Sequence, residues 1–128
     1  MAVTFLSAEW AQAVTDALNG HPGFRSSMGE TELSIQFNTK NAPAGDVSYY
    51  LNTSGGHTDL ALGKADNPDV TIDQGYDTAS AISQGALHIQ TAFMTGKIKG
   101  AGNLAKLMMH QKASGEWGSA VKDLEVEY

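Results

Sequence analysis

Cysteine is absent from this chain of 128 residues, which excludes disulfide bonds, thiolate zinc sites and cysteine nucleophiles together. Long apolar runs are missing as well, and none approaches the roughly 20 residues that span a bilayer as a helix. The four histidines, at positions 21, 57, 88 and 110, show none of the spacings that bind zinc. The sequence therefore predicts no metal site and no cofactor.

Basic residues are also scarce, at 8 Lys and Arg against 14 Asp and Glu, and the formal net charge is −6. Nucleic-acid binding usually needs a basic face that replaces phosphate counterions, so no nucleic-acid partner is predicted. The acids are unevenly distributed, because none lies between Thr78 and Gly115. Lys97, Lys99 and Lys106 lie in this interval and form either a solvated face or a contact for a carboxylate, a phosphate group or an anionic membrane.

A secretory signal is not evident, since residues 1–9 lack a basic start followed by a long apolar segment, and residues 125–128 carry no peroxisomal address. Cytoplasmic localisation is the resulting expectation. A chain of this length has the usual size of one domain and buries roughly two thirds of its unfolded surface. We predict a single domain over residues 1–128, in a monomer or weak dimer.

Apolar periodicity predicts one helix followed by a series of strands. The helix begins after Ser7, a good N-cap, and ends at Gly20 and Pro22. Its apolar stripe consists of Trp10, Ala13, Val14, Ala17 and Leu18. Alternation of apolar and polar residues then predicts strands around residues 33–37, 47–51, 60–62 and 70–72. The turns between them are short enough to favour antiparallel neighbours, which predicts a four-strand meander with one apolar face.

Helical patterns return after residue 73. Asp77 is expected to cap a helix that ends near Gly85, and a second short helix is expected over residues 88–95. A fifth strand at residues 97–99 would direct Ile98 inward.

Asn103 is expected to cap a last helix over residues 104–111, whereas the acidic tail after Lys122 is weakly specified. Helices before and after a run of mainly antiparallel strands are typical of an α+β domain.

The segment FMTGKIKGAGNLAKLMMHQ, residues 93–111, resembles the signature of the sterol carrier protein type two family. In that family a Phe-Met-Ser/Thr-Gly-Lys run leads through Gly-Asn into a helix, and the resemblance extends here from the helix of Trp10 to Gln111. It implies a five-stranded, mostly antiparallel sheet with helices covering one face and an apolar tunnel between the layers. It also implies non-catalytic binding and transfer of a long-chain lipid, which in the family is a fatty acid, a fatty acyl-CoA, a phospholipid or a sterol.

Apolar stripes on strands and helices are usually core packing, and the resemblance shifts their interpretation towards a tunnel lining. Unbranched methionines add to this, because they repack easily around hydrocarbon. Gln90 is a candidate partner for a ligand hydroxyl, and Trp117 either covers the cavity or packs on the helical layer. The predicted ligand-binding residues are Leu33, Ile35, Phe37, Tyr49, Leu51, Leu60, Leu62, Ile82, Phe93, Met94, Leu104, Leu107 and Met108.

Residues 100–105, GAGNLA, match a dinucleotide-binding fingerprint, but no second parallel strand follows them, so these glycines are interpreted as a turn before the capped helix. Neither a G-x-S-x-G elbow nor a carboxylate pair in an apolar setting is present. Enzyme chemistry therefore has no positive support. The alternatives to a lipid carrier are a small enzyme acting on an apolar substrate and a structural partner module with a filled core.

Overall fold

The computed structural model describes residues 3–29, 31–43, 45–109 and 111–127, and among these all side chains except those of Leu107 and residues 111–114. The strands are β1 (Val3–Thr4), β2 (Leu33–Lys40), β3 (Val47–Ser54), β4 (His57–Leu62), β5 (Val70–Gly75), β6 (Ile98–Gly102) and β7 (Val126–Glu127). The helices are α1 (Ala8–Asn19), α2 (Pro22–Met28), α3 (Tyr76–Ser83), α4 (Ile89–Met94), α5 (Leu104–Met108) and α6 (Gln111–Val121).

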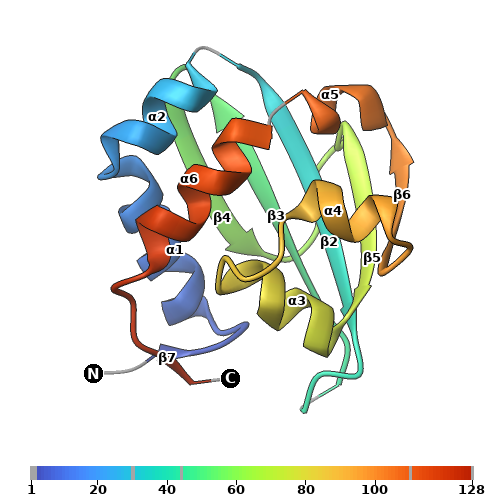
Figure 1. Cartoon of the computed structure of the whole chain (residues 1–128). Coiled ribbons are helices and arrows are strands. Elements are labelled where there is room, and N and C mark those ends of the chain that lie inside the picture. Colours follow the sequence, from blue (N-terminus) through green and yellow to red (C-terminus); the bar gives the residue numbers. More distant parts are fainter. Residues whose placement is uncertain (1–2, 30, 44, 110, 128) are drawn as a thin grey trace.

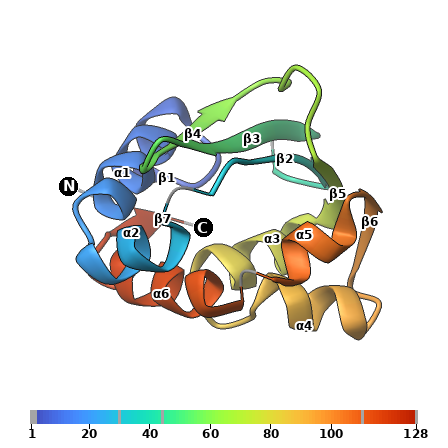
Figure 2. The same cartoon turned by 90° about the horizontal axis from the view of Figure 1, so that it is seen from above.

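Five strands form one sheet in the order β4-β3-β2-β5-β6, and all neighbours are antiparallel except β2 and β5. Helices α3, α4 and α6 lie over one face of this sheet (Figure 1), and α1 and α2 continue the helical layer beside β4 (Figure 2). The predicted α+β class and the mostly antiparallel five-stranded sheet are confirmed. Each predicted strand is present, including β6 with Ile98 buried.

The predicted four-strand meander is wrong, because β5 pairs with β2 in parallel instead of following β4 at the sheet edge. The connection between them, residues 63–69, crosses the face opposite α3, α4 and α6 (Figure 2). Gln36 on β2 anchors it: its Nε2 donates to the Gly63 carbonyl at 3.1 Å, and its Oε1 accepts from the Ala65 N–H at 2.7 Å. These bonds between a strand and a distant loop are not visible as a local sequence pattern.

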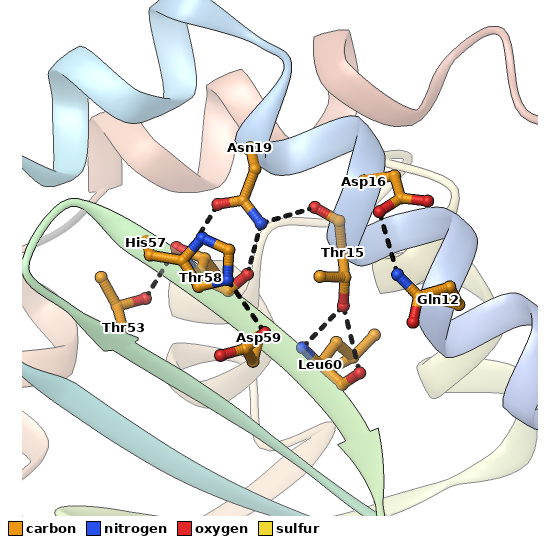
Figure 3. A network of polar contacts seen from close by, with 9 residues as sticks. All are labelled: Gln12, Thr15, Asp16, Asn19, Thr53, His57, Thr58, Asp59 and Leu60. Atoms are coloured by element: carbon orange, nitrogen blue, oxygen red, sulfur yellow. Dashed lines mark hydrogen bonds and ion pairs between the residues drawn. The ribbon is translucent and has the colours of Figure 1, made fainter.

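Helix α1 packs along β4 and occupies the hydrogen-bonding edge of that strand with two side chains (Figure 3). Thr15 Oγ1 accepts from the Leu60 N–H at 2.9 Å and donates to the Leu60 carbonyl at 3.1 Å. One helical turn later, Asn19 accepts from the Thr58 N–H at 2.9 Å and donates to the Thr58 carbonyl at 2.7 Å. The two side chains replace a neighbouring strand, so this edge of the sheet is closed.

The acidic tail is ordered, contrary to the expectation from its sequence, because β7 pairs in parallel with β1. Val3 donates to the Glu125 carbonyl and Phe5 to the Glu127 carbonyl, both at 2.9 Å. A non-local pairing therefore joins the two ends of the chain beside α1 (Figure 1).

Helix boundaries follow the predicted caps in part. Ser7 and Asn103 act as expected, since their side chains accept from the N–H groups of Trp10 and Lys106 at 3.1 Å each. The α3 prediction is wrong at its start, because the N-cap is Gly75 and Asp77 lies in the first turn.

Two helices were not predicted, α2 and α6. Pro22 begins α2 at a position where a helix needs no N–H donor. From the sequence, this proline was predicted only to end the preceding helix. Gly115 and Gly118 lower the helix propensity of α6, and packing against α1 and α2 outweighs that cost.

Candidate functional site

An apolar cavity of about 90 Å³ lies between the inner face of the sheet and the helical layer. Strands β2 and β3 provide its floor, and the helices with the α3–α4 connection provide its walls and roof. It is lined by Trp10, Phe24, Met28, Leu33, Ile35, Phe37, Tyr49, Leu51, Ile82, Ser83, Leu87, His88, Ile89, Gln90 and Trp117.

The floor follows from the two-residue period of the strands, which directs alternate side chains of β2 and β3 to one face. Phe37 and Tyr49 are opposite each other in register and their rings stack with centroids 4.8 Å apart. The Tyr49 hydroxyl accepts from Gln74 Nε2 at 2.9 Å, and the same amide donates to Thr39 at 3.2 Å. Burial raises the pKa of the Tyr49 phenol above 10.0, and the hydrogen bonds with Gln74 and Thr39 only partly offset it. The floor is therefore uncharged at neutral pH.

The roof comes from helices that lie far apart in the sequence. Phe24 and Met28, four residues apart, present one apolar face of α2 to the cavity, and Trp117 contributes its ring from α6. Trp117 Nε1 donates to the Ser83 carbonyl at 3.2 Å, which fixes α6 against the end of α3. Leu87 is half-buried and His88 is exposed, so the cavity approaches the surface at the α3–α4 connection.

The predicted ligand-binding residues divide into two groups. Those that line this cavity are Leu33, Ile35, Phe37, Tyr49, Leu51 and Ile82. Those with described side chains that lie outside its lining are Leu60, Leu62, Phe93, Met94, Leu104 and Met108. The side chain of Leu107 lies outside the described part of the structure.

Most of the residues outside the lining are kept from the cavity for a physical reason. Leu60 belongs to the edge strand beneath α1, and Leu62, where that strand ends, is 39% exposed. Met94 is 75% exposed at the end of α4, contrary to its predicted inward position. Phe93 and Leu104 are half-buried and pack over the same face of Gly100, where a Cβ atom would come within 2.8 Å of Leu104 Cδ2 and 3.3 Å of the Phe93 ring. They extend the core beside β6 instead of lining the cavity.

Several lining residues were not predicted from the sequence, above all Phe24 and Met28. Their signal was present as a proline followed by apolar residues four positions apart. Trp10 was recognised only as part of the helical stripe, although its ring reaches the cavity. Gln90, named as a candidate for a polar ligand group, does line the cavity and is 4% exposed.

Comparison with protein families gives a match over residues 7–113 to the SCP-2 sterol transfer family. The chain belongs to this family. The match covers the first helix, the whole five-stranded sheet and the start of α6, and it confirms the resemblance inferred from residues 93–111. Lipid binding or transfer is thereby supported as the general activity. A search of curated proteins gave no match.

Solved structures share the fold at low sequence identity. A crystal structure of sterol carrier protein 2 has a TM-score of 0.76 at 22% identity, covering 94% of this chain and 98% of its own. A Thermus thermophilus protein described as possibly a sterol carrier protein has a TM-score of 0.80 at 21% identity, covering 98% and 93%. Palmitated SCP2L2 from Aedes aegypti has a TM-score of 0.54 at 23% identity, covering 77% and 93%.

The lysines of this SCP-2 chain do not act as one group. Lys106 forms an ion pair with Asp69 at 3.2 Å, so its charge is largely engaged within the molecule. The Ser34 N–H, which donates to the same carboxylate at 2.9 Å, lowers the pKa of Asp69, and Lys106 adds to this against the opposing effect of burial. Lys97 and Lys99 are exposed and remain the candidate cations of the surface.

The histidine nearest to an acid in the β3–β4 turn lies on the surface. His57 and Asp59 are 3.1 Å apart with both side chains 60% exposed, as expected for a turn histidine. Among the residues described, no cluster of three His, Asp or Glu side chains has the arrangement of a metal site. Within the same ranges, none of the helices has the length and apolar character required to cross a membrane.

Proposed function

We propose that this protein binds one long-chain lipid in the cavity between sheet and helices and transfers it without covalent change. The observation that carries the proposal is the cavity itself, an apolar space enclosed by the sheet floor and helical roof of a chain belonging to the SCP-2 sterol transfer family. A fatty acid is the favoured ligand, because the structurally similar Aedes aegypti protein is palmitated and because the lining suits a flexible hydrocarbon chain.

The energetics of such binding require little polar recognition. Each methylene group moved from water into an apolar site contributes about 0.8 kcal/mol, so a chain of roughly 16 carbons gains about 12 kcal/mol before the costs of association. A cavity of about 90 Å³ is smaller than the roughly 300 Å³ at which ligand pockets usually begin. We therefore infer that the helical layer moves away from the sheet when a long chain enters.

Helices α2 and α6 are the candidates for this movement. They contact each other and α1 more than they contact the sheet, and one partly exposed pair, His21 Nε2 with Glu116 Oε2 at 3.0 Å, joins them. Gly23 leaves room for this pair, since a Cβ atom there would collide with the Glu116 carboxylate. Separation of these helices would expose Phe24, Met28 and Trp117 to an incoming chain.

Transfer also requires contact with a membrane, and we propose that Lys97 and Lys99 approach anionic headgroups. Both are exposed, they lie in the interval from Thr78 to Gly115 that has no acidic residue, and Met94 beside them exposes an apolar side chain. An exposed methionine next to two lysines suits a surface that is anionic outside and apolar beneath.

Native mass spectrometry of freshly purified protein, followed by lipid extraction, tests the proposed function. The expected result is a mass increase that corresponds to one long-chain fatty acid, or uptake of one equivalent of fluorescent fatty acid after delipidation. Protein that carries no lipid and takes up no fatty acid would show that the cavity is only a packing space.

A further inference from the structure

A second cavity, of about 190 Å³, lies beside the first and beneath the carboxyl-terminal tail. Its lining residues come from α1, α3, α6 and the tail that leads to β7: Trp10, Val14, Ser83, Gln84, Val121, Lys122, Leu124 and Val126. Trp10 and Ser83 line both cavities, so the two spaces adjoin at these residues.

The second cavity differs from the first in chemistry. Gln84 and Lys122, whose side chains carry an amide and an ammonium group, are among its lining residues. Lys122 is exposed, and none of the ion pairs formed by the described residues involves it. The second space therefore combines polar and apolar lining residues, and it adjoins the apolar first cavity at Trp10 and Ser83.

The boundary between the cavities contains a buried hydrogen-bond donor, the indole N–H of Trp10. Trp10 is 1% exposed, and its Nε1 has no hydrogen-bond partner among the described residues. Its ring is held in place by edge contacts with Phe5 and Tyr49, at centroid distances of 5.0 and 5.3 Å. A buried N–H without an acceptor destabilises a fold, and an oxygen atom of a ligand at this boundary would remove that cost.

We propose that the second cavity binds the carboxylate of a free fatty acid whose chain occupies the first cavity. The carboxylate accepts a hydrogen bond from Trp10 Nε1 and pairs with the ammonium group of Lys122. This inference rests on the proposed function and adds the orientation and head-group class of the ligand. A space of about 190 Å³ has room for a carboxylate, which is smaller than a coenzyme A or glycerophosphate group.

Charge in the tail does not oppose this arrangement strongly. Asp123 and Glu125, the nearest acids in the sequence, are exposed to water. Water and salt weaken the repulsion that these exposed carboxylates exert, with a screening length of about 8 Å at physiological ionic strength. Lys122, by contrast, is one of the residues that line the cavity. Lys122 thus provides a positive charge in the cavity lining, whereas Asp123 and Glu125 are not among the lining residues.

Two variants measured with two ligands test this head-group site. Palmitate and methyl palmitate have the same chain, but only palmitate carries a charge. Lys122→Gln should weaken palmitate binding by about tenfold and leave methyl palmitate unchanged, because the lost interaction is charge-assisted. Trp10→Phe keeps an aromatic ring, removes the N–H and should weaken both ligands. Lys40→Gln, at an exposed lysine at the end of β2, is the matched control and should bind like the wild type.

The outcomes separate this inference from the proposed function. If the wild type binds neither ligand, the proposed function fails and the head-group site fails with it. If the wild type binds palmitate and Lys122→Gln matches Lys40→Gln with both ligands, the head-group site alone is overturned. Weakening of palmitate by Tyr49→Phe but not by Lys122→Gln would place the carboxylate at the Tyr49 hydroxyl and would equally overturn it. Thermal denaturation confirms that each variant is folded.

Discussion

At the scale of single residues, Tyr49 shows how one side chain serves two environments. Its ring stacks on Phe37 in the cavity floor, while its hydroxyl joins Gln74 in a buried polar group. Burial holds the pKa of this phenol above 10.0 in the folded state. Below pH 10 the phenol is protonated in both states and makes no pH-dependent contribution. As pH rises above 10, only the unfolded chain loses the proton, so the free energy of unfolding falls.

The Tyr49→Phe variant tests this linkage. Wild-type protein should lose up to about 1.4 kcal/mol of stability per pH unit through this one group above pH 10, and the variant should lose less. Urea denaturation between pH 9 and about pH 11 measures the difference. Tyr50→Phe, at the next position of β3, is the matched control for the loss of one hydroxyl. Parallel pH profiles for wild type and Tyr49→Phe would contradict a buried, protonated Tyr49.

Ile82 is a position at which the cavity can be filled with little disturbance, because it lines the cavity yet is only half-buried. Ile82→Trp should occupy part of the 90 Å³ space and weaken fatty-acid binding by about tenfold or more. Thr91→Trp, on the exposed side of α4 and outside the lining, should bind like the wild type. Fluorescent fatty-acid titration gives both affinities. Equal affinities would show that the ligand lies elsewhere.

At the scale of secondary-structure elements, the junction of α1 with β4 decides how the sheet ends. Thr15 and Asn19 pair with the backbone of Leu60 and Thr58 and thereby block a strand edge to which another chain could bind (Figure 3). Two polar residues one turn apart on a helix are easily read as solvent-facing. In this fold they hold α1 against β4, as the apolar stripe beside them holds α1 against the core.

Thr15→Val tests the edge contact, since it keeps the shape of the side chain and removes its hydroxyl. The Leu60 N–H and carbonyl would then be buried without partners, which should lower the free energy of unfolding by about 1–3 kcal/mol. Thr15→Ser retains the hydroxyl and is the control. Chemical denaturation compares the two. A loss in Thr15→Ser as large as that in Thr15→Val would mean that the methyl group, not the hydroxyl, matters.

At the scale of the whole molecule, the local charge of one surface differs from the net charge of the chain. The chain is acidic overall, at −6, yet the interval from Thr78 to Gly115 contains no acid and provides Lys97 and Lys99 on the surface. Pairing with Asp69 removes Lys106 from this group, although all three lysines were candidates for contact with an anionic membrane. The contact we propose is therefore smaller than the sequence alone indicated.

The double variant Lys97→Glu with Lys99→Glu tests that contact. Each lysine near an anionic surface contributes about 1 kcal/mol, so transfer to vesicles containing phosphatidylserine should slow by about tenfold or more, with little change in fatty-acid affinity. Lys40→Glu with Lys64→Glu produces the same change in net charge at other exposed positions and is the control. Equal slowing by both double variants would assign the effect to total charge rather than to this surface.

Local sequence patterns were enough to identify the five strands of the main sheet, which face of each is apolar and where several helices begin. Alternation in residues 33–37, the cap at Ser7 and the cap at Asn103 act through neighbouring residues, so they are visible in one dimension. The family was also visible there, because its signature is continuous in residues 93–111.

Only the tertiary structure revealed the strand order, the roles of α2 and α6 and the set of residues that line the cavity. Gln36 bonds to the distant loop that leads to β5, and the roof combines Phe24 and Trp117 from distant parts of the chain. Met94 and Ile82 are both apolar residues on short helices, yet one faces water and the other the cavity. Local periodicity fixes a face, but which partner covers that face is set by contacts between residues far apart in the sequence.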